Sequence, residues 1–162
     1  MAGKTLKELF VETLRDIYFA EKQILRALPK MANAAHSDAL RAGFKLHREE
    51  TEEHVARLEK IFAMLDLTPR GKKCEAILGI IEEGKEIMGD FHGTPSLDAG
   101  LVSAGQAVEH YEIARYGTLK TWAGQLGLAE ARTLLQKTLD EEVATDRKLS
   151  ELAESDLNRK AA

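Results

Sequence analysis

Apolar residues recur along most of the chain three and four positions apart, which is the spacing of an amphipathic helix. The first such stripe consists mainly of apolar residues, at Leu6, Phe10, Thr13, Ile17, Ala20, Ile24, Ala27 and Met31. Similar stripes run from Leu40 to Leu65, from Leu101 to Trp122 and from Ala131 to Leu152, with a shorter one from Ile77 to Phe91. Because no run alternates between β-branched and polar residues, we predict helices and no strands.

Helix-breaking residues gather in four clusters that separate these stripes. The clusters are Asn33 to Asp38, Leu67 to Gly71, Gly89 to Ser96 and Gly124 to Gly127. They predict five helices of about 28, 28, 18, 28 and 29 residues. Pro29, near the end of the first helix, marks a candidate kink.

The four long helices each carry one apolar stripe, which predicts an all-α four-helix bundle. The shorter third segment would be roughly 27 Å long, enough to carry the chain most of the way along such a bundle. A single long crossover between the second and third bundle helices is typical of ferritin-like bundles. We therefore predict one ferritin-like domain over residues 1–162, with a fifth, shorter helix in the crossover.

Composition narrows the class of protein. The chain is 44% hydrophobic and 31% charged, which is too apolar for a disordered chain. Its net charge of −4 and its single basic run, Arg70 to Lys73, argue against a nucleic-acid partner. The lone Cys74 excludes a disulfide framework, a Cys-rich zinc site and a rubredoxin-type iron centre.

Targeting signals are not visible in the sequence. The N-terminal residues are amphipathic from the start and lack the apolar core of a signal peptide. The longest apolar stretch, Ile77 to Ile81, is far shorter than the ~20 residues of a membrane span. We expect a cytoplasmic protein with no membrane partner.

Carboxylates interrupt the inward stripes near the middle of each long helix. Glu112 and Glu142 occupy stripe positions, and Glu21 and Glu50 lie at the edges of theirs. Each of the four is about 15 residues from the centre of its helical hairpin, which places all of them roughly 22 Å from the loops. They therefore fall on one level of the bundle, and Glu109 lies one short turn before Glu112.

Buried anions at one level would repel one another, and two divalent metal ions would compensate them. His47 or His54 could supply an imidazole ligand, which iron accepts well. For His47, the roles of metal ligand and of hydrogen-bonding partner to a ligand are equally plausible, whereas His54 is expected at the surface or as such a partner. The alternative is a salt-bridged core without metal, for which Arg115 would be the cation.

Several other residues receive plainer interpretations. His110 is a candidate for orienting a carboxylate. We expect Cys74 to be a small buried side chain. The aromatic residues expected in the core are Tyr18, Tyr111, Tyr116 and Trp122. The acidic residues around the two histidines that we expect to be solvated are Glu49, Glu52, Glu53 and Glu59.

Several segments resemble the YciE/YciF family, a ferritin-like family of bacterial stress-associated proteins. Its most specific motifs here are Arg-Gly-Lys-Lys-Cys-Glu, starting at Arg70, and Val-Glu-His-Tyr-Glu-Ile-Ala, starting at Val108. The resemblance also covers Ala20 to Met31, His47 to Thr51, Tyr116 to Thr118 and Leu139 to Glu142. It implies a rubrerythrin-like bundle, a homodimer and a di-metal site.

The resemblance also implies a ligand set. Glu21 would be a terminal ligand, Glu50 and Glu142 would bridge the metals, and Glu109 and Glu112 would serve from a Glu-x-x-Glu motif. The usual Glu-x-x-His motif is not present, because Glu53 and Thr145 stand where its histidines would be. His47, His54 or Asp146 are the candidates to complete the set.

The function implied is that of a stress-response carboxylate protein with two iron ions, manganese being the alternative metal. Such a protein would react with O₂ or peroxide, or oxidise Fe(II), as a peroxidase-like or ferroxidase-like oxidoreductase. The sequence leaves open whether it is an enzyme. The alternative function is a non-catalytic dimeric helical module with a structural or vestigial metal site that acts through protein interaction.

Overall fold

Helices account for most of the computed structural model, which describes residues 4–162. The five main helices are α1 (Leu6–Ala34), α2 (Asp38–Met64), α3 (Glu75–Asp90), α4 (Leu97–Gln125) and α5 (Ala129–Leu152). Within the described residues there is no strand, and no helix is long and apolar enough to cross a membrane. The predicted all-α architecture, with its four long helices and one shorter one, is confirmed.

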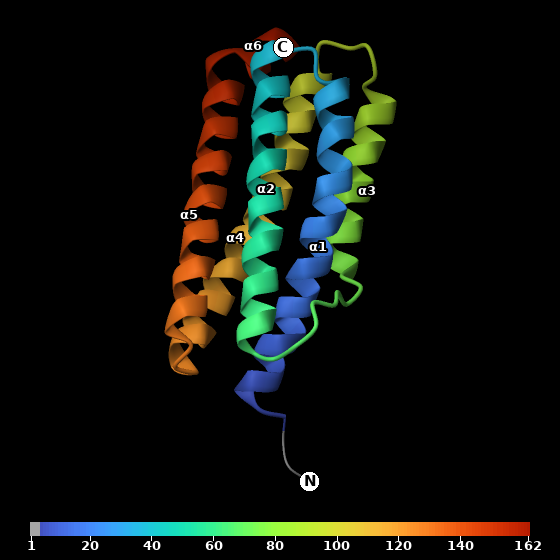
Figure 1. The fold of residues 1–162 in the computed structure, drawn as a ribbon. Helices are drawn as coiled ribbons and strands as arrows, with labels where there is room; N and C mark the ends of the chain where they lie inside the picture. The colour runs from blue at the N-terminus through green and yellow to red at the C-terminus, as the bar shows by residue number, and fades with distance from the viewer. Residues whose placement is uncertain (1–3) are drawn as a thin grey trace.

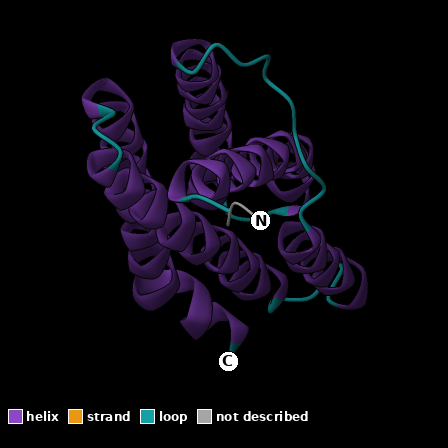
Figure 2. Cartoon of the chain, turned by 90° about the horizontal axis from the view of Figure 1, so that it is seen from below, coloured by secondary structure: helices purple, strands orange, loops and turns teal. Residues whose placement is uncertain are grey.

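The four long helices form the bundle, and α3 covers one side of it (Figure 1). α1 packs against α2, α4 packs against α5, and the two hairpins join through contacts of α1 with α4 and of α2 with α5. α3 packs on α1 and α4, outside the ring of four, as the end-on view also shows (Figure 2). Only Ile77 and Gly84 of α3 are buried. The crossover helix is thus a cover on the bundle.

Local signals explain where the first helices begin and end. Thr5 and Glu8 form a reciprocal capping box at the start of α1, and the Ser37 side chain caps α2. α1 continues past Pro29 to Ala34, so the proline does not end the helix. The basic run from Arg70 to Lys73 lies in the connection between α2 and α3.

The end of the chain differs from the prediction of one final helix of about 29 residues. α5 stops at Leu152 after 24 residues, and a π-helical turn (Ala153–Leu157) and a short α6 (Asn158–Ala161) follow. The π turn buries Ala153 and Leu157, and this segment contacts α4. Burial of these two side chains decides the geometry, and helix propensity alone does not reveal it.

The core has apolar layers above and below a polar middle. The buried apolar residues come largely from the predicted stripes, as Phe10, Ile17, Ile24, Leu40, Phe44, Leu58, Ile61, Leu101, Leu119, Leu135 and Leu149 show. Between these layers, the buried residues are glutamates, histidines and threonines. The apolar layers fix the positions of the helices and therefore the positions of the polar residues between them.

Asp98 fastens the two hairpins together at one end of the bundle. Its two carboxylate oxygens accept hydrogen bonds from the backbone N–H groups of His36 and Ser37, at 2.8 and 2.7 Å. The side chain is buried, and it lies in the first turn of α4, where a negative charge is favourable. One carboxylate thus joins the start of α4 to the loop between α1 and α2.

We predict that Asp98→Ala lowers the free energy of unfolding by about 2–3 kcal/mol, because it leaves two backbone donors without their charged acceptor. Urea unfolding followed by circular dichroism measures the loss. Asp90→Ala, at an exposed aspartate of α3, is the control and should change stability by less than ~1 kcal/mol. Equal stability of the two variants would show that this fastening contributes nothing.

Candidate metal centre

Six ionisable side chains meet in the polar middle of the bundle. Glu21 comes from α1, His47 and His54 come from α2, Glu109 and Glu112 come from α4, and Glu142 comes from α5. None is more than 3% exposed. The level predicted by counting residues from the hairpins is therefore occupied by carboxylates from three of the four bundle helices and by histidines from the other.

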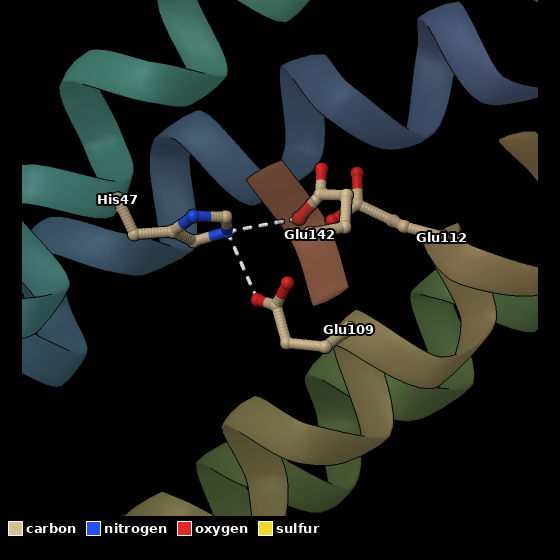
Figure 3. Close-up of side chains that lie close together, drawn as sticks. All are labelled: His47, Glu109, Glu112 and Glu142. Carbon is tan, nitrogen blue, oxygen red and sulfur yellow. Dashed lines mark ion pairs between the residues drawn. The ribbon is translucent and has the colours of Figure 1, made fainter. Parts of the chain in front are cut away.

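Their ligand atoms fall into two groups. In the first, one atom each of His47, Glu109, Glu112 and Glu142 lie within 4.8 Å of one another. Figure 3 shows the His47 ring pointing toward the carboxylates, with Nε2 2.9 Å from Glu109 Oε1 and 3.8 Å from Glu142 Oε2. This group combines one imidazole with three carboxylates.

The second group contains Glu21, His54 and Glu142, again within 4.8 Å. His54 Nδ1 lies 2.9 Å from Glu142 Oε1 and 3.4 Å from Glu21 Oε1. Glu142 belongs to both groups, and its two oxygens face different histidines. The arrangement is that of two adjacent metal positions with one carboxylate able to bridge them.

Several carboxylate oxygens that face the middle of the cluster lack hydrogen bonds. Both carboxylate oxygens of Glu112 are fully enclosed and without a hydrogen-bond partner, and so are Glu21 Oε2 and Glu109 Oε2. Buried carboxylate oxygens left in this way are costly unless a cation compensates them. The donor set therefore fits metal ions.

Burial and mutual repulsion shift the acidities of these groups. Burial and the charge of Glu142 raise the pKa of Glu109 and of Glu112 well above the ordinary value for glutamate. Burial lowers the pKa of His54, but its contacts with Glu142 and Glu21 outweigh that effect and raise it to about 10. In the absence of metal the cluster thus retains protons, which a metal ion would displace.

A hydrogen-bonded chain behind His54 orients its ring. His54 Nε2 lies 3.0 Å from Glu141 Oε2, and Glu141 is held by both guanidinium nitrogens of Arg57, at 2.6 and 3.0 Å. Arg57 also donates to Thr138 Oγ1 at 3.1 Å. Because Glu141 is an acceptor paired with a cation, it favours the proton on Nε2 and leaves Nδ1 free to bind metal.

Two hydroxyl groups complete the surroundings of the cluster. Tyr116 is fully buried and donates a hydrogen bond to Glu21 Oε1. Thr51 donates to the backbone oxygen of His47 at 2.7 Å, within α2. Tyr116 is a core residue, as expected, and it also fixes Glu21 Oε1, the oxygen that lies 3.4 Å from His54 Nδ1.

Five of the seven metal ligands predicted from the sequence lie in the cluster, namely Glu21, His47, Glu109, Glu112 and Glu142. Glu50 and Asp146 do not belong to either group. The Glu50 carboxylate is 26% exposed and lies 3.5 Å from His47 Nδ1, on the far side of the ring from the cluster. Asp146 pairs instead with His110 Nε2, at 3.2 Å.

His54 is not at the surface, which was one of the two positions expected for it, because its side chain is completely buried. It follows His47 by seven positions, which is two helical turns, and both histidines therefore face the bundle interior. That spacing was the signal for a second imidazole. The four acidic residues of α2 that we expected to be solvated are indeed exposed, namely Glu49, Glu52, Glu53 and Glu59.

Arg115 does not neutralise the cluster, as the metal-free alternative required. Its guanidinium lies over the ring of Tyr111, 5.3 Å from the centroid, and the side chain is only half-buried. Arg57, which is buried, pairs with Glu141 and not with the central glutamates. Within residues 4–162, no arginine or lysine forms an ion pair with Glu21, Glu109, Glu112 or Glu142.

Comparisons with known proteins place this arrangement in context. A family model described as a domain of unknown function, DUF892, matches residues 5–162. The protein YciF of Escherichia coli strain K12 is 44% identical over 162 residues, which cover 99% of this chain and 98% of YciF. The matched region thus contains every residue of the cluster.

Two solved structures have the same fold as this chain over nearly its whole length. The crystal structure of the E. coli stress protein YciF has a TM-score of 0.92 and 43% identity, and covers 97% of this chain and 99% of its own. YcfI of Rhodopseudomonas palustris, which is described as a candidate structural protein, has a TM-score of 0.88 and 45% identity, and covers 91% and 94%.

We predict that Glu112→Gln stabilises the metal-free protein by about 1–2 kcal/mol at pH 8, because it removes a buried charge repelled by its neighbours. The pKa of Glu112 is higher in the folded than in the unfolded chain, so the stability it contributes is present at low pH and lost as the pH rises toward the folded value. The gain in the variant should therefore shrink at pH 5.

Thermal unfolding at both pH values, in the presence of a chelator, measures the effect. Glu53→Gln, at an exposed glutamate of α2, is the matched control and should leave the midpoint unchanged at both pH values. If Glu112→Gln lowers the midpoint at pH 8, the cluster is not strained by its charges.

Proposed function

Because the chain belongs to the DUF892 family and is related to the stress protein YciF, as its motifs predicted, we propose that it is a di-iron carboxylate protein of the stress response. Its chemistry would be the oxidation of Fe(II) or of the bound metal by O₂ or peroxide. Manganese is the alternative metal. The homodimer expected from the sequence is part of this proposal.

The observation that carries the proposal is the shared position of Glu142. Its carboxylate belongs to both groups of ligand atoms, and its two buried oxygens face different histidines. A single structural ion would require only one such group. Two adjacent groups joined by one carboxylate support a pair of ions held close together, which is the arrangement used for two-electron chemistry.

Charge and ligand type favour iron or manganese. The cluster offers four carboxylates and two imidazoles, and two divalent cations would neutralise the four carboxylates. Mixed carboxylate and imidazole sets suit iron, whereas magnesium and calcium prefer oxygen ligands alone. Thiolate ligands are absent from both groups, which disfavours a structural zinc site of the cysteine type.

When bound, a pair of such ions would supply one electron each to an oxidant. The chain's own residues provide the rest. His47, Glu109 and Glu112 would hold one position, Glu21 and His54 would hold the other, and Glu142 belongs to both groups. The surrounding apolar layers exclude water, and Tyr116 holds a proton at the Glu21 oxygen that it contacts.

The second candidate function is the non-catalytic helical module. The observation in its favour is the description of YcfI, a relative with the same fold, as a candidate structural protein. In that case the metals would contribute stability without turnover. The two functions are separated by the behaviour of bound Fe(II) toward an oxidant.

We predict that anaerobic Fe(II) loading gives about two ions per chain, and that Glu142→Ala loses both because Glu142 serves both groups. Glu21→Ala and His47→Ala should each retain about one ion, since each residue belongs to one group only. Metal analysis after removal of free iron measures these ratios. Glu151→Ala, at an exposed glutamate of α5, is the control and should bind as the wild type does.

The same series decides whether the two groups are separate. If Glu142→Ala retains one ion, the carboxylate is not shared. Binding of no metal by the wild type under any of these conditions would refute the di-metal proposal.

We predict further that the bound Fe(II) of the wild type is oxidised on exposure to air at least about tenfold faster than free Fe(II) under the same conditions. Ferric absorbance followed in a stopped-flow instrument measures the rate. Glu142→Ala should oxidise iron at the background rate, and Glu151→Ala should behave as the wild type. Two stably bound ions that oxidise no faster than free iron would favour the structural module.

A further inference from the structure

An apolar cavity of about 290 Å³ lies beside the carboxylate cluster. Residues from all five main helices line it, so it extends from beneath the cover helix α3 into the middle of the bundle. At its inner end the lining includes His47 and Glu109, which are 3% and 2% exposed. The cavity therefore connects the outer side of α1 and α3 with one of the two ligand groups.

Small residues at the helix contacts make room for this cavity. Ala27, Gly43, Gly84 and Gly105 all line it. A Cβ added at Gly43 would meet no atom within 4 Å, and one added at Gly84 would make an ordinary 3.6 Å contact with Ala104. The remaining lining includes eleven leucine, isoleucine, methionine and valine side chains, with Phe44 and Ala104. This apolar part of the cavity favours a hydrocarbon.

Four cations line the cavity, namely Arg26, Lys30, Lys85 and Lys148, together with three glutamates, Glu50, Glu82 and Glu109. Arg26 and Lys30 lie on α1 one turn apart, and both are exposed and line the cavity. Lys85 of α3 also lines it but is paired with Glu82, at 2.9 Å. Neither Arg26 nor Lys30 forms an ion pair within residues 4–162, so two cations remain for an anionic group at this end.

We propose that this cavity binds a medium-chain aliphatic carboxylate. The hydrocarbon chain would fill the apolar interior with its methyl end toward His47 and Glu109, and the carboxylate would lie at Arg26 and Lys30. An apolar interior matches a hydrocarbon chain and a cationic rim matches a carboxylate, so the site suits an amphipathic anion. Binding does not require metal; if the proposed function holds, the chain end lies next to the metal positions.

The size of the cavity sets the chain length. A cavity of ~150 Å³ accommodates a benzene molecule, so about twice that volume suits an extended chain of roughly ten carbon atoms. Each methylene that leaves water strengthens binding by about fourfold, so octanoate should bind roughly tenfold more weakly than decanoate. Chains well beyond the capacity of the cavity, such as hexadecanoate, should gain nothing further.

Calorimetric titration of the metal-free full-length protein with decanoate tests the proposal, with one saturable site per chain expected. Gly43→Leu, which places a side chain in the cavity, should weaken binding at least about tenfold. Gly79→Leu is the matched control, because Gly79 is exposed on α3, lies outside the cavity lining and has equally open space around an added Cβ. Ala27→Leu serves as a second filling variant if Gly43→Leu does not fold.

The charged rim has its own matched pair of variants. The double change Arg26→Glu with Lys30→Glu should weaken decanoate binding about tenfold, and Lys60→Glu with Arg70→Glu, at exposed cations outside the cavity, should not. Isotope-filtered NOE spectra of the metal-free complex should show the ligand's terminal methyl protons near His47 or Val108.

The outcomes that overturn the proposal are distinct from failure of the metal site. No saturable binding of decanoate, or binding that strengthens steadily up to hexadecanoate and ignores Gly43→Leu, refutes the cavity site. Decanol binding as tightly as decanoate refutes the cationic anchor. Methyl contacts confined to α3 and the outer part of α1 refute the inward orientation. Since every arm uses metal-free protein, none depends on whether iron binds.

Discussion

Uncompensated negative charge at the centre of the bundle is the constraint on which the rest of the structure depends. Glu21, Glu109, Glu112 and Glu142 converge from three helices into the buried middle of the bundle, and within residues 4–162 the two histidines on α2 are the only basic side chains paired with them. Carboxylates so arranged repel one another at close range, where the low dielectric strengthens the repulsion. The fold must hold them together against that force.

Two kinds of interaction supply this restraint. Apolar layers on both sides of the cluster fix the separation of the helices, and Asp98 ties the hairpins at one end. Around the cluster, Arg57 with Glu141 and Tyr116 with Glu21 fix individual rings and carboxylates. The first set determines where the backbone lies and the second determines which atom faces the centre. A preorganised site needs both, because ligand geometry tolerates only small displacements.

The sequence was informative about height along the bundle and less so about rotation around each helix. Counting residues from the hairpins placed Glu112 and Glu142 correctly because the rise per residue is constant. The same count could not show that Glu50 lies outside the cluster. Glu50 is at the right height along the bundle, but its carboxylate is 26% exposed and contacts His47 Nδ1. The burial of His54 was left open for the related reason that its charged neighbours in sequence, such as Glu52 and Glu53, are exposed. The π turn after α5 arises from tertiary burial, which no local pattern records.

The cover helix α3 has a consequence for motion. Because it buries only Ile77 and Gly84 completely, α3 gives up less apolar contact on detaching than any of the four bundle helices. Its amide hydrogens should therefore exchange with solvent through local opening, whereas those of the bundle helices should exchange only through global unfolding. Access to the interior beneath α3 can then be governed by fluctuations of one peripheral helix, with the ligand groups on α1, α2, α4 and α5 remaining in register throughout.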